Sequence, residues 1–200
     1  MVLRGKIRGN GSQLAKYLLT KADNDNVQVL EIVGTAHEHD LRKSLLEMSL
    51  TSELTKTDKG LYHVQICPAY GEDRKMTGED WRRAAEIIEQ ETGFSGQKRA
   101  IVLHDKKGKI HAHVVWERFN HEKGVMIPSK FFRLAQDRAR MTIEQVFEHV
   151  RTPERNKQRT EMKQYLSDTW RRTHDAASFK KLIAERGYVI AAGTQRPFMV

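Results

Sequence analysis

The chain has 200 residues, of which 38% are hydrophobic and 30% charged, and it carries a formal net charge of +9 at pH 7. This length accommodates one domain, or one domain and a small appendage, and is sufficient for a hydrophobic core. The apolar runs are too short for a membrane span or a secretory signal, and the one cysteine, Cys67, excludes an internal disulfide framework and fits a reducing compartment.

Hydrophobic periodicity predicts helices and strands in alternation along the chain. Helices are predicted where apolar residues recur every three or four positions: at 13–21 after an N-cap at Ser12, at 37–54, at 81–92 after a capping box at Thr77, from Pro128 to about 150, at about 155–172 and at about 175–186. Strands are predicted at 27–33, 61–67, 98–105 and 109–118, followed by a terminal hairpin at 187–192 and 196–200. Consecutive hairpin strands indicate an α+β fold with one mostly antiparallel central β-sheet and helices packed on one of its faces.

The helical pattern is interrupted at Thr152-Pro153, which predicts a boundary between a main domain at 1–150 and a basic helical and β-hairpin extension at 151–200. The extension carries eleven Lys and Arg against five Asp and Glu. This charge favours a polyanionic partner, of which nucleic acid is the first candidate. The alternative is a solvated helical surface that binds no partner. The chain stops inside its last predicted strand, so we interpret it as a fragment of a longer protein.

Three histidines within ten residues are the most informative feature: His104, His111 and His113. His111 and His113 lie on the same face of a predicted strand, and a tight turn at Gly108 returns His104 beside them. Three neutral imidazoles that converge on one point form a metal site with open positions. The alternatives are coincidence and the His-x-His-x-His motif of nucleotidyl hydrolases, in which Lys109 stands where the first histidine would be.

Several segments together resemble the conjugative and mobilisation relaxases of the HUH endonuclease superfamily, of the plasmid MobA and T-DNA border nuclease type. These segments are 62–68 (Tyr-His-Val-Gln-Ile-Cys-Pro), a helix that starts near Thr77, the pattern His104-x6-His111-x-His113, and 15–20 (Ala-Lys-Tyr-Leu-Leu-Thr). The resemblance covers most of residues 9–120. The sequence departs from the family where an Asp often follows the first histidine by two residues, because Lys106 stands there and Asp105 follows by one.

The resemblance implies a site- and strand-specific nickase that cleaves single-stranded DNA at a plasmid transfer origin by metal-assisted tyrosine transesterification. Tyr17 is then the nucleophile that forms a 5′-phosphotyrosyl adduct, and the three histidines hold a divalent metal. Mn or Mg is expected, with Zn, Co or Ni as alternatives. The same resemblance implies a bacterial cytoplasmic location, encoding by a plasmid or mobile element, and partners among accessory mobilisation proteins and a type IV secretion coupling protein.

Without the resemblance, Tyr17 would be interpreted as a core aromatic on the apolar face of its helix, beside Leu14 and Leu18. Tyr62 and Tyr70 are the alternative nucleophiles. His63 is interpreted as a half-buried strand residue, with an approach to the DNA or the metal as the alternative.

Acid–base and DNA-binding residues are predicted around the histidines. Candidate acid–base partners are Asp105, which would orient a ligating imidazole, Glu38 and Glu117. Cations that flank the hairpin are expected to contact DNA phosphates: Lys106, Lys107, Lys109 and Arg118.

Two other functions remain open from the sequence. A replication-initiation nuclease with the same histidines would place its tyrosine later in the chain, where Tyr165 is the candidate. A non-catalytic, metal-stabilised DNA-binding module would bind DNA with a steep salt dependence and would not cleave it.

Overall fold

Five antiparallel strands form the central sheet in the computed structural model of the chain, which describes residues 1–152, 159–192 and 198–199. The strands are β1 (Val2–Arg8), β2 (Asn26–Val33), β3 (Leu61–Cys67), β4 (Arg99–Lys106) and β5 (Lys109–Glu117), in the spatial order β1-β3-β5-β4-β2. Every neighbouring pair is antiparallel. The predicted α+β fold with a mostly antiparallel sheet is therefore confirmed.

The hairpin between β4 and β5 is closed by the two-residue turn Lys107-Gly108, with Lys106 paired to Lys109. Both turn residues have positive φ, +52° and +72° respectively. That conformation matches the right-handed twist of the flanking strands, and glycine adopts it without steric cost. The turn therefore fixes the register of the two strands that carry the three histidines.

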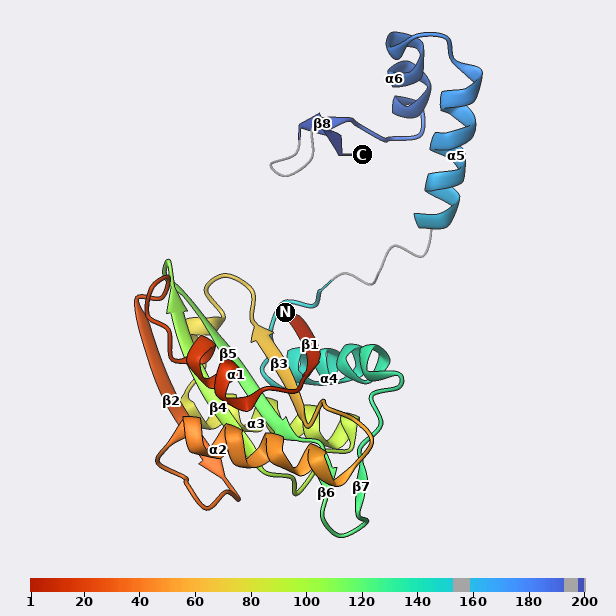
Figure 1. Ribbon diagram of the computed structural model, residues 1–200. Coiled ribbons are helices and arrows are strands. Elements are labelled where there is room, and N and C mark those ends of the chain that lie inside the picture. The colour runs from red at the N-terminus through yellow and green to blue at the C-terminus, as the bar shows by residue number, and fades with distance from the viewer. Residues whose placement is uncertain (153–158, 193–197, 200) are drawn as a thin grey trace. The chain divides into compact units, whose positions relative to one another are not determined.

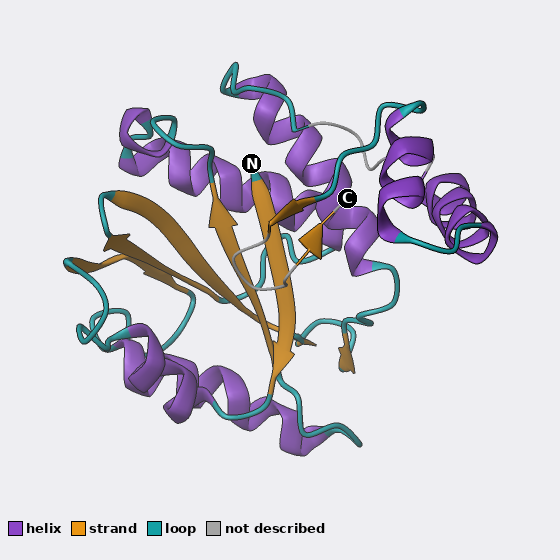
Figure 2. Cartoon of the chain, turned by 90° about the horizontal axis from the view of Figure 1, so that it is seen from above, coloured by secondary structure: helices purple, strands orange, loops and turns teal. Residues whose placement is uncertain are grey.

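Helices cover both faces of the sheet (Figures 1 and 2). One face is covered by α1 (Gly11–Leu18) and α2 (Leu41–Leu50), which is followed by a short 3-10 turn at Thr51–Leu54. The other face is covered by α3 (Gly78–Thr92) and α4 (Phe132–Val146). Shorter elements complete this part of the chain: a 3-10 turn at Asp73–Lys75 and the strands β6 (Phe119–Asn120) and β7 (Val125–Met126).

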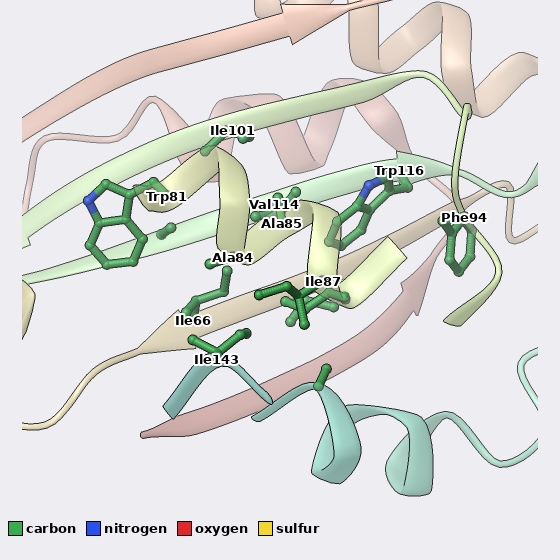
Figure 3. Packing of buried hydrophobic residues seen from close by; sticks show 14 of the residues in the cluster. Ile66, Trp81, Ala84, Ala85, Ile87, Phe94, Ile101, Val114, Trp116 and Ile143 are labelled. Carbon is green, nitrogen blue, oxygen red and sulfur yellow. The ribbon is translucent and has the colours of Figure 1, made fainter. Parts of the chain in front are cut away.

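The larger core lies between the sheet and the α3/α4 layer. The Thr77 side chain and Asp80 form the predicted capping box at the start of α3. Figure 3 shows the apolar side of that helix, including Trp81, facing strand residues such as Trp116, with Ile143 of α4 closing the cluster. Trp81 and Trp116 are 1% and 0% exposed, so both indoles report on this core.

The smaller core, on the opposite face, holds α1 against α2 and the sheet. Leu14 and Leu18 of α1 pack with α2 residues such as Leu45 and with strand residues of β3, β4 and β5. The two helices approach so closely at Gly11 that a Cβ there would lie 1.9 Å from the backbone oxygen of Leu45. Glycine at this position therefore permits the packing that places α1 beside the sheet.

The chain divides into two compact units, Met1–Arg151 and Thr152–Val200. The second contains α5 (Arg159–Arg172), α6 (Ala176–Ala184), β8 (Ala191–Ala192) and β9 (Phe198–Met199). Within it, the Tyr165 hydroxyl donates to the Leu182 carbonyl at 2.8 Å, and the rings of Trp170 and Phe179 meet edge to face. Among the described residues, no helix is both long and apolar enough to cross a membrane.

Some sequence predictions are wrong in detail. Helices lie on both faces of the sheet, not one, because α1 and α2 bury their own apolar stripe on the second face. No strand was predicted at Val2–Arg8, where alternating cations and a glycine weaken the apolar signal. The N-cap of α1 is Asn10, whose side chain accepts from the Gln13 backbone, not Ser12. The helix predicted at 37–54 is shorter, because α2 spans Leu41–Leu50 and a 3-10 turn follows it.

Candidate metal centre and nucleophile

The three predicted histidines converge on the face of the sheet that carries α1. His104 of β4 pairs directly with His111 of β5, and His113 lies two residues further along β5, so all three side chains leave the same face. The ring of His104 lies 5.4 Å from that of His111 and 4.5 Å from that of His113, between centroids. One nitrogen from each ring lies within 4.8 Å of the other two.

All three imidazoles are in the neutral form that a metal needs. Burial is the main cause that lowers the pKa of His104 and His111, and it lowers the pKa of His113 to about 2. Neighbouring imidazoles add to the effect at His111 and His113 because like charges repel. Each ring therefore keeps a lone pair on one nitrogen at neutral pH.

The hydrogen bonds of the triad leave a nitrogen free for a cation. His104 Nε2 lies 2.7 Å from the carbonyl oxygen of Leu18, so Nε2 donates and Nδ1 carries the lone pair. His113 Nε2 is buried and has no hydrogen-bond partner among the described residues, whereas Nδ1 is 2.9 Å from His63 Nε2. A buried, unpartnered nitrogen is costly unless something binds it. A divalent cation that accepts imidazole ligands fits this arrangement.

Tyr17 lies in the last turn of α1, beside the triad. Its ring meets the His113 ring edge to face, with centroids 5.9 Å apart and an interplanar angle of 84°. Its neighbours Leu14 and Leu18 are buried, but Tyr17 is 55% exposed. The interpretation of Tyr17 as a core aromatic is therefore wrong, because it lies at the margin of the apolar stripe and not within it.

Beside Tyr17 is a hollow of about 420 Å³ between α1 and β1, whose lining includes Arg8, Asn10 and Gln13. Tyr17 lines this hollow and is 55% exposed, so its side chain can be approached from solvent on this side.

A row of cations follows the edge strand β1. We call Arg4, Lys6 and Arg8 the basic row: all three are exposed, and they alternate with inward-facing residues. Lys6 pairs with His63 across the β1–β3 ladder, and the charges of Lys6 and Arg8 both act on the His63 ring. The basic row therefore shares the face of the histidines. The alternation of cations is visible in the sequence at 4–8, but no strand was predicted there, so this row was not among the predicted DNA-binding residues.

The other tyrosines are placed differently. Tyr62 is 1% exposed and stacks in the α3/α4 core, and burial raises its pKa to about 12, so it is not a usable nucleophile. Tyr70 is 82% exposed, and Lys109 Nζ lies 5.3 Å from its ring centroid, near the tip of the β4–β5 hairpin. Tyr165 belongs to the second unit, where it is hydrogen-bonded within that unit.

The predicted acid–base residues do not join the triad. Asp105 follows His104 on β4, so its side chain points to the opposite face, where Oδ2 lies 4.0 Å from Arg74 Nη2. Glu38 comes after the end of β2 and accepts from the Gly34 backbone. Val27 pairs with His104, and the six residue steps from Val27 to Val33 span roughly 20 Å, so Glu38 lies far from the triad. Glu117, at the far end of β5, is fully buried and binds His121.

The predicted DNA-binding cations divide into two groups. Lys106, Lys107 and Lys109 lie at the hairpin tip, where Lys106 Nζ is 3.5 Å from an Asp23 carboxylate oxygen. Arg118 is 5% exposed, and its guanidinium donates to the carbonyls of Lys59 and Ile127. The prediction for Arg118 is wrong, because this side chain is used to join backbone segments at the opposite end of β5.

Comparison with known proteins identifies the nuclease domain of relaxases, MobA/VirD2-like, whose family model matches residues 17–149. The match covers about two thirds of the 200 residues, begins at Tyr17 and includes all three histidines. No curated protein matches the chain.

Proposed function

The chain belongs to the relaxases with a MobA/VirD2-like nuclease domain, a family of DNA-nicking enzymes, and on that premise we propose that it cleaves single-stranded DNA at a plasmid transfer origin through Tyr17. The observation that carries the proposal is the position of Tyr17. It is exposed, lies against His113 and opens onto the hollow beside the basic row. A tyrosine in this position can meet a phosphate that also touches a cation held by the triad.

The proposed step is an in-line transesterification. The Tyr17 oxygen forms a bond to phosphorus as the bond from phosphorus to the 3′-oxygen breaks. The phenolic proton passes to solvent or a base, and the leaving 3′-oxygen takes up a proton. The products are a 5′-phosphotyrosyl protein and a free 3′-hydroxyl, and attack by that hydroxyl reverses the reaction.

His104, His111 and His113 would hold the divalent metal, with Mn or Mg as the proposed ion and Zn, Co or Ni as alternatives. When bound, the metal neutralises charge on the non-bridging oxygens and orients the phosphate. The protein contributes a rigid sheet that keeps the three imidazoles neutral and aimed at one point.

The DNA strand is proposed to follow the exposed half of this sheet face. The basic row lies on one side of Tyr17, and the hairpin lysines, Lys106, Lys107 and Lys109, lie beyond His104 and His111. Cations at both ends of the triad would draw the backbone across it, since phosphate contacts set register without reading bases. In transfer, accessory mobilisation proteins and a type IV secretion coupling protein are the partners that we expect to act on the adduct.

Cleavage and adduct formation test the proposal. The full chain is incubated with single-stranded DNA that carries the transfer origin of its own element, with Mn²⁺ or with EDTA, and resolved on a denaturing gel. We expect a metal-dependent protein–DNA adduct that is lost in Tyr17→Phe and retained in Tyr70→Phe, the matched exposed tyrosine. An adduct that survives Tyr17→Phe would refute the assignment of the nucleophile, and tight salt-sensitive binding without cleavage would leave a DNA-binding module.

A further inference from the structure

A fourth histidine, His63 of β3, belongs to the same face of the sheet as the triad. It pairs with Val115 across the β3–β5 ladder, so it is diagonal to His113, which pairs with Gln65. His63 Nε2 lies 2.9 Å from His113 Nδ1, and the two rings are 5.1 Å apart between centroids with planes inclined by 34°. His63 is 6% exposed and His113 is 1% exposed, so this hydrogen bond is shielded from water.

The direction of this hydrogen bond follows from the other nitrogen of His113. That nitrogen, Nε2, is buried without a partner in the described structure, and it belongs to the residue that completes the metal-ligand group. A ligating Nε2 must keep its lone pair, so the single proton of a neutral ring resides on Nδ1. The bond is then Nδ1–H of His113 donating to Nε2 of His63, and His63 carries its own proton on Nδ1.

Burial supports this assignment because it disfavours a second proton on either ring. Burial is the main cause that lowers the pKa of His63 to about 4, with Arg8, His104 and Lys6 adding repulsion. The pKa of His113 is lowered further, to about 2. The two neutral imidazoles therefore share one proton between His113 Nδ1 and His63 Nε2. Only donation from His113 Nδ1 leaves the lone pair of His113 Nε2 available to a metal.

We propose that His63 is a positioning residue that accepts the Nδ1 proton of His113 and so fixes the tautomer and ring plane of this metal ligand. The inference rests on the metal site of the proposed function. Metal-ligating histidines commonly donate their other nitrogen to a carboxylate or a carbonyl. Here the acceptor is a neutral imidazole, which adds no negative charge to the site, so a divalent cation held there would keep more of its charge toward a DNA phosphate. A carboxylate in this position would offset part of that charge.

Each histidine of the triad has its own orienting partner. His104 is held by the Leu18 carbonyl and His113 by His63, while His111 has a backbone hydrogen bond to Lys109. Only His63 is a side chain among these partners, so it is the one that mutation can remove.

Metal affinity tests the inference on the full chain, by calorimetric titration with Mn²⁺ alone. His63→Phe keeps an aromatic ring of similar size but cannot accept a hydrogen bond, and we expect it to weaken Mn²⁺ binding by about 10- to 100-fold. His63→Gln restores an acceptor and is expected to recover most of that loss. Gln65→Leu is the matched control, because Gln65 is opposite His113 on the same face but makes no hydrogen bond to it in the described structure.

A second readout does not depend on metal. Nitrogen-15 NMR of the imidazoles in metal-free protein should show His113 as the Nδ1–H tautomer in the wild type and a mixture of tautomers in His63→Phe. Wild-type affinity in a folded His63→Phe, or an Nε2–H tautomer of His113 in the wild type, would overturn the role of His63 and leave the proposed function standing. A wild-type chain that binds no Mn²⁺ would overturn the metal site and the inference with it.

Discussion

Acid should destabilise the metal-free protein well above the pH at which carboxylates titrate. His63 and His113 are buried as neutral rings, with pKa values lowered to about 4 and about 2, whereas an unfolded histidine titrates near 6.5. A group whose folded pKa lies below its unfolded value contributes stability above the unfolded pKa and loses it as pH falls. The loss therefore begins near pH 6.5.

The magnitude follows from the width of that pH window. Between pH 6.5 and pH 5, the unfolded chain binds a proton at His63 that the folded chain does not, at about 1.4 kcal/mol per pH unit, or about 2 kcal/mol. His113 contributes a similar amount by the same argument, and His104 and His111 add in the same direction because burial lowers their pKa values too. A loss of about 4 kcal/mol is a large part of the stability of a typical domain.

The assay is urea unfolding of the full chain in EDTA at several pH values between 7.5 and 5, followed by tryptophan fluorescence. Trp81 and Trp116 are buried in the first unit and dominate the change, whereas Trp170 is already 62% exposed. His63→Gln should reduce the slope of unfolding free energy against pH by about 1.4 kcal/mol per unit between pH 6.5 and 5. A wild-type stability that stays constant over this range would show that the reasoning from burial is wrong.

Three further outcomes are expected. Replacing the whole basic row with Gln should reduce the slope of log affinity for single-stranded DNA against log salt by about 2, measured by anisotropy, whereas Lys123→Gln at an exposed turn should leave it unchanged. Glu89→Leu should cost about 3 kcal/mol in urea unfolding, because Glu89 accepts from the buried indole N–H of Trp116 at 2.7 Å. Gly11→Ala should cost about 1–3 kcal/mol in the same assay, and should slow nicking on a gel, because its Cβ would displace the helix that carries Tyr17, the proposed nucleophile. The first prediction is contradicted if the basic-row variant keeps the wild-type salt slope. The second is contradicted if Glu89→Leu keeps the wild-type urea midpoint, and the third if Gly11→Ala nicks DNA at the wild-type rate.

The β4–β5 hairpin was predictable because its information is local. The alternation at His111 and His113 assigns both side chains to one face, and the turn at Gly108 brings His104 opposite His111. These features depend on residues within a ten-residue segment. No knowledge of the other strands was needed to predict that the three imidazoles meet.

The sequence left the contact of His63 with the triad open, as an alternative to a half-buried strand residue, because that contact depends on long-range register. His63 reaches His113 only because β3 pairs with β5 in one particular alignment, and a shift by one residue would turn it to the opposite face. The sequence also gave no reason to prefer burial for Arg118, since a long cation after a strand is usually solvated. Its two carbonyl partners come from segments that are far apart along the chain.

The orientation of Tyr17 shows the limit of periodicity in a short helix. The spacing of three and four residues that marks one face of a helix fits Leu14, Tyr17 and Leu18. However, α1 has only eight residues, and only a narrow row of its side chains is buried. Tyr17 is one residue, about 100° of rotation, from Leu18, so a small rotation of the helix decides whether its ring is in the core or at the margin. Packing against α2 at Gly11 sets that rotation, and no local pattern encodes it.

One hydrogen bond links His104, a proposed metal ligand, to the residue next to Tyr17, the proposed nucleophile. His104 Nε2 donates to the carbonyl of Leu18, the residue that follows Tyr17 at the end of α1. The bond fixes the tautomer of His104, and it also anchors the last turn of the helix to β4. Because His104 and Tyr17 are positioned by the same contact, a displacement of α1 would disturb both the proposed metal site and the proposed nucleophile. Nicking should therefore be more sensitive to the packing of α1 than the stability of the fold is.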